Sequence, residues 1–229
     1  MRCLFFDAGP IITLVMSRLS WILPHLKKQF GGTFYITPAV KFELIDRPLT
    51  MNRFKFEALQ VMKLIRDGVL AVYPDVPNDE VKRLSTIANN SFSMRGKSMD
   101  IIQKGEIESV ICAKKLGASV VIDERTVRLF IERSAGMKRL LKSRFRRNVE
   151  PNQQKIQEFT SYFKGLTIIR SIELVSIAYK MKLLDTYIPN GKNGKNILVD
   201  SILWATKFNG CAVTNHEVEE ISQFLLSKI

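Results

Sequence analysis

The chain contains little cysteine and almost no histidine. Of its 229 residues, three are cysteines and two are histidines. Cys3, Cys112 and Cys211 lie far apart, so no pair has the spacing of a zinc site, and their odd number argues against a disulfide framework. We expect three buried free thiols in a reducing compartment. His25 and His216 are isolated in the sequence, and we assign neither to a catalytic triad.

Long hydrophobic runs are also missing. The longest apolar stretches are far shorter than the roughly 20 residues that a transmembrane helix needs. The first residues lead directly into an apolar strand pattern, without the charged and apolar regions of a signal peptide. We therefore expect a cytoplasmic protein with no membrane partner.

Acidic residues are scarce relative to basic ones. The chain has 22 aspartates and glutamates but 35 lysines and arginines, which gives a formal net charge of +13 and an isoelectric point near 9.8. Such an excess points to a polyanionic partner, with nucleic acid as the first candidate and an anionic membrane surface as the second. The alternative interpretation is a generally lysine-rich surface of the kind found in some thermophiles.

The sequence has neither a Walker A loop nor a glycine-rich dinucleotide fingerprint. What it does have is an alternation of short apolar strands with amphipathic helices. Strands are predicted at residues 4–6, 34–36 and 119–122, within "GVLAVYP" and within "LTIIRS". This alternation predicts an α/β fold with a doubly wound, mainly parallel β-sheet flanked by helices.

The predicted helices include one long element over residues 11–30, which Pro24 would kink, and another that stops near "DRP". Asn78 is expected to cap a later helix, and Gly117 to end one. We expect a single domain over 1–229. Within it, residues 1–131 form a core with the acidic site, 132–165 form a basic helical insertion, and 166–229 complete the core.

Four acidic residues are placed near the ends of the predicted strands. Asp7 and Asp123 each end a strand, Glu43 lies in the helix after the second strand, and Glu106 begins the helix that leads into the fourth. Because the carboxyl ends of parallel strands meet at one edge of a sheet, we expect the four to face a common crevice. Carboxylates gathered in this way repel one another unless a cation neutralises them, and their hard oxygen atoms suit Mg²⁺ or Mn²⁺.

Taken one at a time, these acids have ordinary structural explanations. Asp7 precedes Gly9 and Pro10 and can cap a helix, and Asp123 in "DERT" can do the same. An acidic residue such as Glu106 suits a helix N-terminus, and Glu43 alone is typical of a solvated helix. Only their joint placement favours a site in which a metal-activated water attacks a phosphodiester held by the basic surface.

The motifs around these acids resemble those of PIN-domain ribonucleases, in particular the prokaryotic branch related to VapC-type toxins. The resemblance rests on "DAGPIITL", "ITPAVKFELI" and "KGEIESVICAKKLGASVVIDERTVR", and it covers most of residues 1–131. It implies a PIN-like fold and a metal-dependent endoribonuclease that hydrolyses RNA with Mg²⁺ or Mn²⁺. The implied catalytic and metal-binding residues are Asp7, Glu43, Glu106 and Asp123, with Glu108 and Glu124 as supporting acids.

The same resemblance implies single-stranded RNA as the substrate, and it suggests an antitoxin peptide and a second copy of the chain as partners. VapC-type chains are usually shorter, and the basic stretch "MKRLLKSRFRR" has no counterpart in the compact domain. This departure argues against a toxin role more than against the fold. A phosphatase of the haloacid dehalogenase type is disfavoured, because Gly9 stands where that class needs a second aspartate.

The basic stretch is predicted to lie across RNA phosphates, with Phe145 available for base stacking. The predicted RNA-binding residues are Lys138, Arg139, Lys142, Arg144, Arg146 and Arg147. The alternative is a solvated helical face in which Leu140, Leu141 and Phe145 pack on the core.

Two further alternatives concern the site and the function. The segment "VDSILWATKFNGCAVTN" also has an acid, helix and strand pattern, in which Asp200 with Asn215 or Glu217 would displace Glu106 and Asp123. We favour the earlier segment because it contains both "GE" and "IDER". The functional alternative is a non-catalytic factor that binds RNA or the ribosome on a PIN-like fold.

Overall fold

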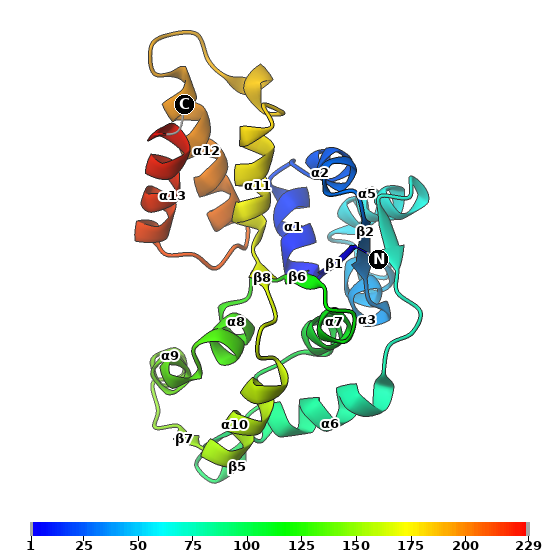
Figure 1. Cartoon of the computed structure of the whole chain (residues 1–229), viewed down its shortest axis with the longest axis vertical. Helices are drawn as coiled ribbons and strands as arrows, with labels where there is room; N and C mark the ends of the chain where they lie inside the picture. Colours follow the sequence, from blue (N-terminus) through cyan, green and yellow to red (C-terminus); the bar gives the residue numbers. More distant parts are fainter. Residues whose placement is uncertain (1, 228–229) are drawn as a thin grey trace.

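A computed structural model describes residues 2–227 of the chain (Figure 1). Its centre is a five-stranded sheet in the order β3-β2-β1-β6-β8, and every neighbouring pair of strands is parallel. The strands are β1 (Cys3–Phe6), β2 (Thr33–Ile36), β3 (Leu70–Val72), β6 (Ser119–Val121) and β8 (Ile168–Ile169). The predicted α/β fold with a parallel sheet is confirmed.

The central strand β1 is buried on both faces, as its continuous apolar sequence indicates. Leu4 and Phe6 pack into one hydrophobic core, and Cys3 and Phe5 pack into the other. The first core is covered by α1 (Ala8–Met16), α2 (Ile22–Phe30), α5 (Lys55–Arg66), α11 (Ser171–Lys180), α12 (Gly194–Phe208) and α13 (Asn215–Ser227). The second is covered by α6 (Asn78–Asn89), α7 (Lys104–Lys115), α8 (Arg125–Glu132), α9 (Met137–Phe145) and α10 (Gln153–Tyr162).

The long helix predicted over residues 11–30 is wrong, because this stretch forms two helices. α1 ends at Met16, Arg18 adopts a positive φ of 58°, and α2 begins at Ile22. Pro24 lies in the first turn of α2, where a backbone N–H has no intrahelical partner, so the proline disturbs no hydrogen bond of the helix.

The helix predicted to stop near "DRP" ends at Leu49, one residue beyond that tripeptide. It consists of α3 (Pro38–Lys41), a π-helical turn η1 (Phe42–Asp46) and α4 (Arg47–Leu49). In the wide turn, the Arg47 N–H donates to the carbonyl of Phe42, five residues earlier. A proline ring crowds the carbonyl four residues before it, and this wider turn accommodates the crowding.

The polar and basic region after α8 is helical, as predicted. It contains a short 3₁₀ turn η2 (Ser134–Gly136), α9, β7 (Glu150–Pro151) and α10. Strand β7 joins β4 (Phe92–Met94) and β5 (Lys97–Ser98) in a small antiparallel sheet with the order β5-β4-β7. The stacked rings of Phe130 in α8 and Phe159 in α10, with centroids 4.4 Å apart, fix this region to the second core.

Smaller predictions have mixed outcomes. The three cysteines are free and buried, as expected. Gly117 follows α7 with a φ of +59° and ends it as predicted. Asn78 is the first residue of α6 and not its cap.

A 3₁₀ turn η3 (Asp185–Tyr187) follows α11. Within residues 2–227, no helix has both the length and the apolar character needed to cross a membrane.

Candidate active site

Asp7 lies where β1 ends, as the sequence predicts. It is the N-cap residue of α1, and its Oδ2 accepts a hydrogen bond from the Gly9 N–H at 3.3 Å. The residue is only 5% exposed. The pKa of Asp7 is raised to about 7, mainly by burial and also by the nearby carboxylates of Glu43 and Asp123, although backbone hydrogen bonds from Ala8 and Gly9 lower it. Asp7 is therefore both a helix cap and a buried carboxylate among other acids.

Glu106 occupies the first turn of α7 and is also buried. Its Oε2 accepts a hydrogen bond from the Gln103 N–H at 2.8 Å, which satisfies one of the free donors at the start of the helix. Burial raises the pKa of Glu106 to about 8, and the charges of Asp7, Glu124 and Glu43 act in the same direction. Asp7 and Glu106 thus disfavour each other's ionised form.

Glu43 reaches the same edge from the π-helical turn. Thr37 starts this helix, because its Oγ1 accepts from the Val40 N–H at 3.3 Å, and Pro38 occupies the first turn. Glu43 is half-buried and packs against Gly105, where an added Cβ would lie 2.9 Å from the Glu43 Oε1. Burial raises the pKa of Glu43, while the Gly105 backbone and Arg47 oppose that rise. The glycine lets α7 approach Glu43 closely.

The supporting acid Glu108 fixes the two helices together. Its buried Oε2 accepts from the Ala39 N–H at 3.1 Å, in the first turn of α3. One turn of α7 therefore carries Glu106 at the edge and Glu108 as a cap for the neighbouring helix.

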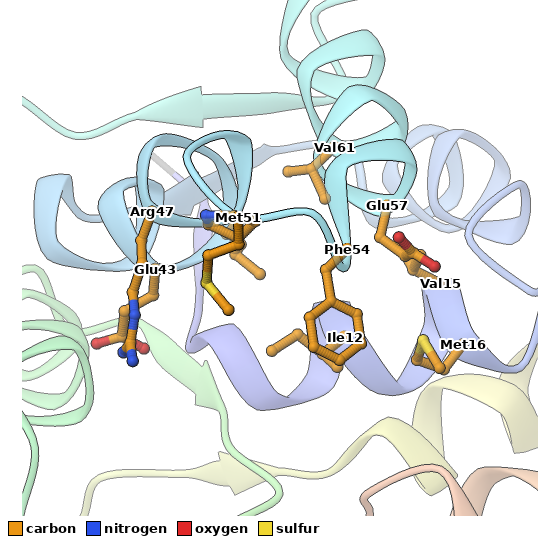
Figure 2. Close-up of a pocket in the computed structure, with 11 residues that line it drawn as sticks. Ile12, Val15, Met16, Glu43, Arg47, Met51, Phe54, Glu57 and Val61 are labelled. Carbon is orange, nitrogen blue, oxygen red and sulfur yellow. The ribbon is translucent and has the colours of Figure 1, made fainter.

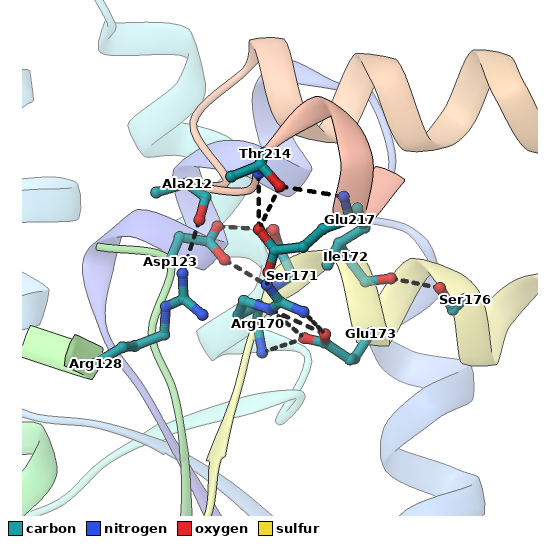
Figure 3. Close-up of polar contacts among 10 residues, drawn as sticks. All are labelled: Asp123, Arg128, Arg170, Ser171, Ile172, Glu173, Ser176, Ala212, Thr214 and Glu217. Carbon is teal, nitrogen blue, oxygen red and sulfur yellow. Dashed lines mark hydrogen bonds and ion pairs between the residues drawn. The ribbon is translucent and has the colours of Figure 1, made fainter. Parts of the chain in front are cut away.

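Asp123 follows β6 and is the most enclosed of the four acids, at 1% exposure. It accepts hydrogen bonds from the Thr13 hydroxyl at 2.9 Å, the Ser171 N–H at 2.8 Å and the Ser171 hydroxyl at 2.7 Å. Its backbone carbonyl accepts from the Ala212 N–H at 3.3 Å. Figure 3 shows Asp123 between the start of α11 and the segment before α13. Asp123 therefore connects three parts of the chain that are distant in sequence.

Gly9 separates Asp7 from Asp123. A Cβ at Gly9 would lie 3.5 Å from the Asp7 Oδ2 and 3.7 Å from the Asp123 Cβ.

The carboxylate oxygens of the four acids suit a divalent cation in charge and in chemistry. Within residues 2–227, however, no three histidine, cysteine, aspartate or glutamate side chains are grouped so that they could hold one metal ion. The four-carboxylate site stays a prediction.

The C-terminal segment does not supply the strand beside β1 that the alternative site required. Residues 211–214 form no strand, and the sheet position beside β1 is taken by β6. Asp200 is exposed on α12, where its Oδ1 accepts from the Ser222 hydroxyl at 3.5 Å. Glu217 forms an ion pair with Arg170 at 2.7 Å.

The predicted RNA-binding residues lie on one exposed face and its end. α9 buries Met137 and Leu141 in the second core, and Leu140 packs against it, whereas Phe145 is 41% exposed. The alternative in which all three apolar residues of this stretch pack on the core is therefore wrong for Phe145. Arg144 pairs with Glu124 at 3.4 Å, beside Asp123. The six exposed cations are Lys138, Arg139, Lys142, Arg144, Arg146 and Arg147.

An apolar groove that the sequence did not reveal opens beside Glu43 and Arg47 (Figure 2). It has a volume of about 260 Å³ and lies between α1 and the η1–α5 segment. Ile12, Met16 and Phe54 are exposed apolar side chains in its wall. The i, i+4 spacing of Ile12 and Met16 on the outer face of α1 is the sequence signal that indicates it.

Comparisons with protein-family models, with curated proteins and with solved structures give no match to this chain. The resemblance to PIN-domain ribonucleases therefore rests on the quoted motifs alone and stays a prediction.

Proposed function

We propose that this chain is a metal-dependent nuclease with a PIN-like fold, which hydrolyses RNA phosphodiester bonds at its acidic sheet edge. The observation that supports the proposal best is the burial of Asp7 and Glu106 beside each other with raised pKa values. Within residues 2–227, neither carboxylate forms an ion pair with a lysine or arginine. Buried charges of this kind are costly unless a partner neutralises them, and they concentrate at functional sites.

The partner whose chemistry suits these groups is Mg²⁺ or Mn²⁺, because both prefer hard carboxylate oxygens. Asp7, Glu43, Glu106 and Asp123 are the residues that would hold it. When bound, such an ion supplies a water of lowered pKa as nucleophile and stabilises the leaving oxygen. Thr13 and Ser171 fix the orientation of the Asp123 carboxylate through their hydroxyl groups.

Two features favour RNA as the substrate. The net charge of +13 attracts a polyanion, and the exposed cations of α9 continue to the acidic edge through the contact of Arg144 with Glu124. The exposed ring of Phe145 beside these cations suits stacking on an unpaired base.

Cleavage of end-labelled single-stranded RNA tests the proposal. The wild type should cut with Mn²⁺ or Mg²⁺ and not with EDTA, and Asp7→Asn and Glu106→Gln should each abolish cutting. Asp200→Asn is the matched control, because this exposed aspartate of α12 lies away from the edge. Cleavage that persists in EDTA, or in the Asp7→Asn variant, would refute the metal mechanism.

One observation favours a second function, a non-catalytic RNA- or ribosome-binding factor. Asp7, Glu106 and Asp123 each accept hydrogen bonds from neighbouring backbone or hydroxyl groups, and no three acids are gathered around one point in the described chain. Tight RNA binding by a folded wild type that does not cut in Mn²⁺ would support it. An antitoxin peptide and a second copy of the chain stay predictions from the resemblance.

A further inference from the structure

A second pocket, rich in arginine, lies next to Asp123. It has a volume of about 420 Å³ and is enclosed by α8, β8, the start of α11 and the segment that leads into α13. Arg125, Arg128, Arg133 and Arg170 contribute to its wall. We call it the arginine pocket.

Arg170 belongs to the frame of this pocket. Its Nη1 contacts the Glu217 Oε1 at 2.7 Å, and its Nε donates to the Glu173 Oε1 at 2.9 Å (Figure 3). Glu217 in turn accepts from the Thr214 N–H at 2.8 Å. These two carboxylates neutralise Arg170 and hold the start of α11 against the start of α13.

The other three arginines have no such partners. Arg128 is half-buried, its Nη2 donates to the Ala212 carbonyl at 2.7 Å, and its buried Nε has no hydrogen-bond partner. Within residues 2–227, Arg125, Arg128 and Arg133 form no ion pair. Of the three glutamates in the pocket wall, Glu173 and Glu217 pair with Arg170, and only Glu132 does not. Arg128 is half-buried, Arg125 and Arg133 are exposed, and the four arginines of the wall outnumber its three glutamates, so the pocket favours an anion.

The pocket is joined to the acidic edge by short chain segments. Ser171, which donates twice to Asp123, directly follows Arg170. Ala212 accepts from Arg128 through its carbonyl and donates to the Asp123 carbonyl through its N–H. An anion held in the pocket would therefore lie beside the acid that the proposed reaction uses.

We propose that the arginine pocket binds a phosphate group of the RNA strand. The planar guanidinium fork matches the oxygens of a phosphate, which makes arginine the usual residue for recognising that group. The identity of the strand rests on the proposed function above, whereas the preference for a phosphate rests on the pocket itself.

The test measures RNA binding without cleavage. Single-stranded RNA with a 3′ fluorophore, carrying either a 5′-phosphate or a 5′-hydroxyl, is titrated in EDTA and followed by fluorescence anisotropy. Arg128→Gln and Arg133→Gln should each weaken binding by about tenfold, since charge-assisted hydrogen bonds are lost. Each should also reduce the salt-dependence slope by about 0.7 for every phosphate contact removed. Lys195→Gln, on the exposed first turn of α12, is the control.

The outcomes separate the sources of the phosphate. A preference for the 5′-phosphorylated RNA that disappears in the variants assigns the pocket to a strand end, and an equal loss on both RNAs assigns it to an internal phosphate. Unchanged affinity and slope in both variants would overturn the proposal. So would thermal stabilisation by inorganic phosphate with unchanged RNA affinity. Because EDTA prevents cleavage, this result stands apart from the cleavage test, and exposed Arg133 keeps the test valid if Arg128→Gln does not fold.

Discussion

Asp7 combines two roles that a substitution can separate. As the N-cap of α1 it accepts a hydrogen bond from Gly9, and as a buried acid it carries a raised pKa. Asparagine caps helices as well as aspartate does, but it has no charge to desolvate. Asp7→Asn therefore retains the structural role and removes the charge.

We expect this substitution to stabilise the metal-free chain in a pH-dependent way. Because the pKa of Asp7 is about 7 in the folded chain against 3.8 ordinarily, the folded chain keeps a proton that the unfolded chain loses between these values. The free energy of unfolding of the wild type therefore falls as the pH rises from 4 to 7. Asp7→Asn should be more stable by on the order of 2 kcal/mol at pH 8 and nearly equal at pH 4. Urea unfolding in EDTA measures both, and a less stable variant at pH 8 would contradict the buried-charge interpretation.

At the scale of elements, the approach of α7 to the π-helical turn sets the position of Glu43. Gly105→Ala places a methyl group 2.9 Å from the Glu43 Oε1, a contact that forces the carboxylate to move. We expect metal-dependent cleavage to fall at least several-fold. The thermal midpoint should change little, because the roughly 1 kcal/mol that alanine gains over glycine in helix propensity offsets the cost of moving the Glu43 carboxylate. Lys115→Ala at the exposed end of α7 is the control, and undiminished cleavage by Gly105→Ala would exclude a role for Glu43.

The docking of α11 depends on its first residue. The Ser171 hydroxyl donates to the buried Asp123 carboxylate at 2.7 Å, and Ser171→Ala removes this bond. We expect a loss of about 1.5–3 kcal/mol in the free energy of unfolding, the range for a hydrogen bond to a charged group. Ser176→Ala serves as the comparison, because that hydroxyl bonds only to the Ile172 carbonyl of its own helix. Equal losses in chemical denaturation would mean that the Asp123 contact has no special weight.

The sequence predicted the elements whose signals are local. The apolar runs predicted β1, β2 and β6 to within one residue, and they placed β3 and β8 within short stretches. The break between α1 and α2 was missed, because the apolar spacing continues across Arg18 while the backbone turns there. The π-helical turn before Pro48 was not predicted, because such a turn has no local signature in one sequence.

The acids of the candidate edge could be placed from the sequence for the same reason, since each is adjacent to a strand or helix end. The arginine pocket could not. Arg128, Arg170 and Ala212 meet only after β8 has paired with β6 and α13 has packed on the first core. No spacing along the chain records a contact between residues so far apart.

The protein as a whole has an excess of positive charge, while the acids of the candidate edge are buried. We expect the combined replacement of Arg144, Arg146 and Arg147 by glutamine to weaken RNA binding and to flatten its salt dependence. The slope should fall by about 2, if each cation contacts one phosphate of a single strand. Anisotropy titrations at several salt concentrations measure this.

The control for that triple variant removes the same charge elsewhere. Lys28, Lys192 and Lys195 are exposed and lie outside the basic insertion. If their replacement by glutamine weakens binding as much as the loss of the three arginines, then net charge alone attracts the RNA and the face of α9 has no special role.

The hydrogen bonds of Asp123 have a consequence for the order in which the protein is made. Thr13 emerges early during synthesis, but Ser171 and Ala212 emerge only with the last third of the chain. Domains fold as units while the ribosome delivers them from the N-terminus. The acidic edge therefore cannot reach its final arrangement on a nascent chain that ends before Ala212. A protein proposed to cut RNA would thus stay incomplete for most of the time in which it is tethered to its own messenger.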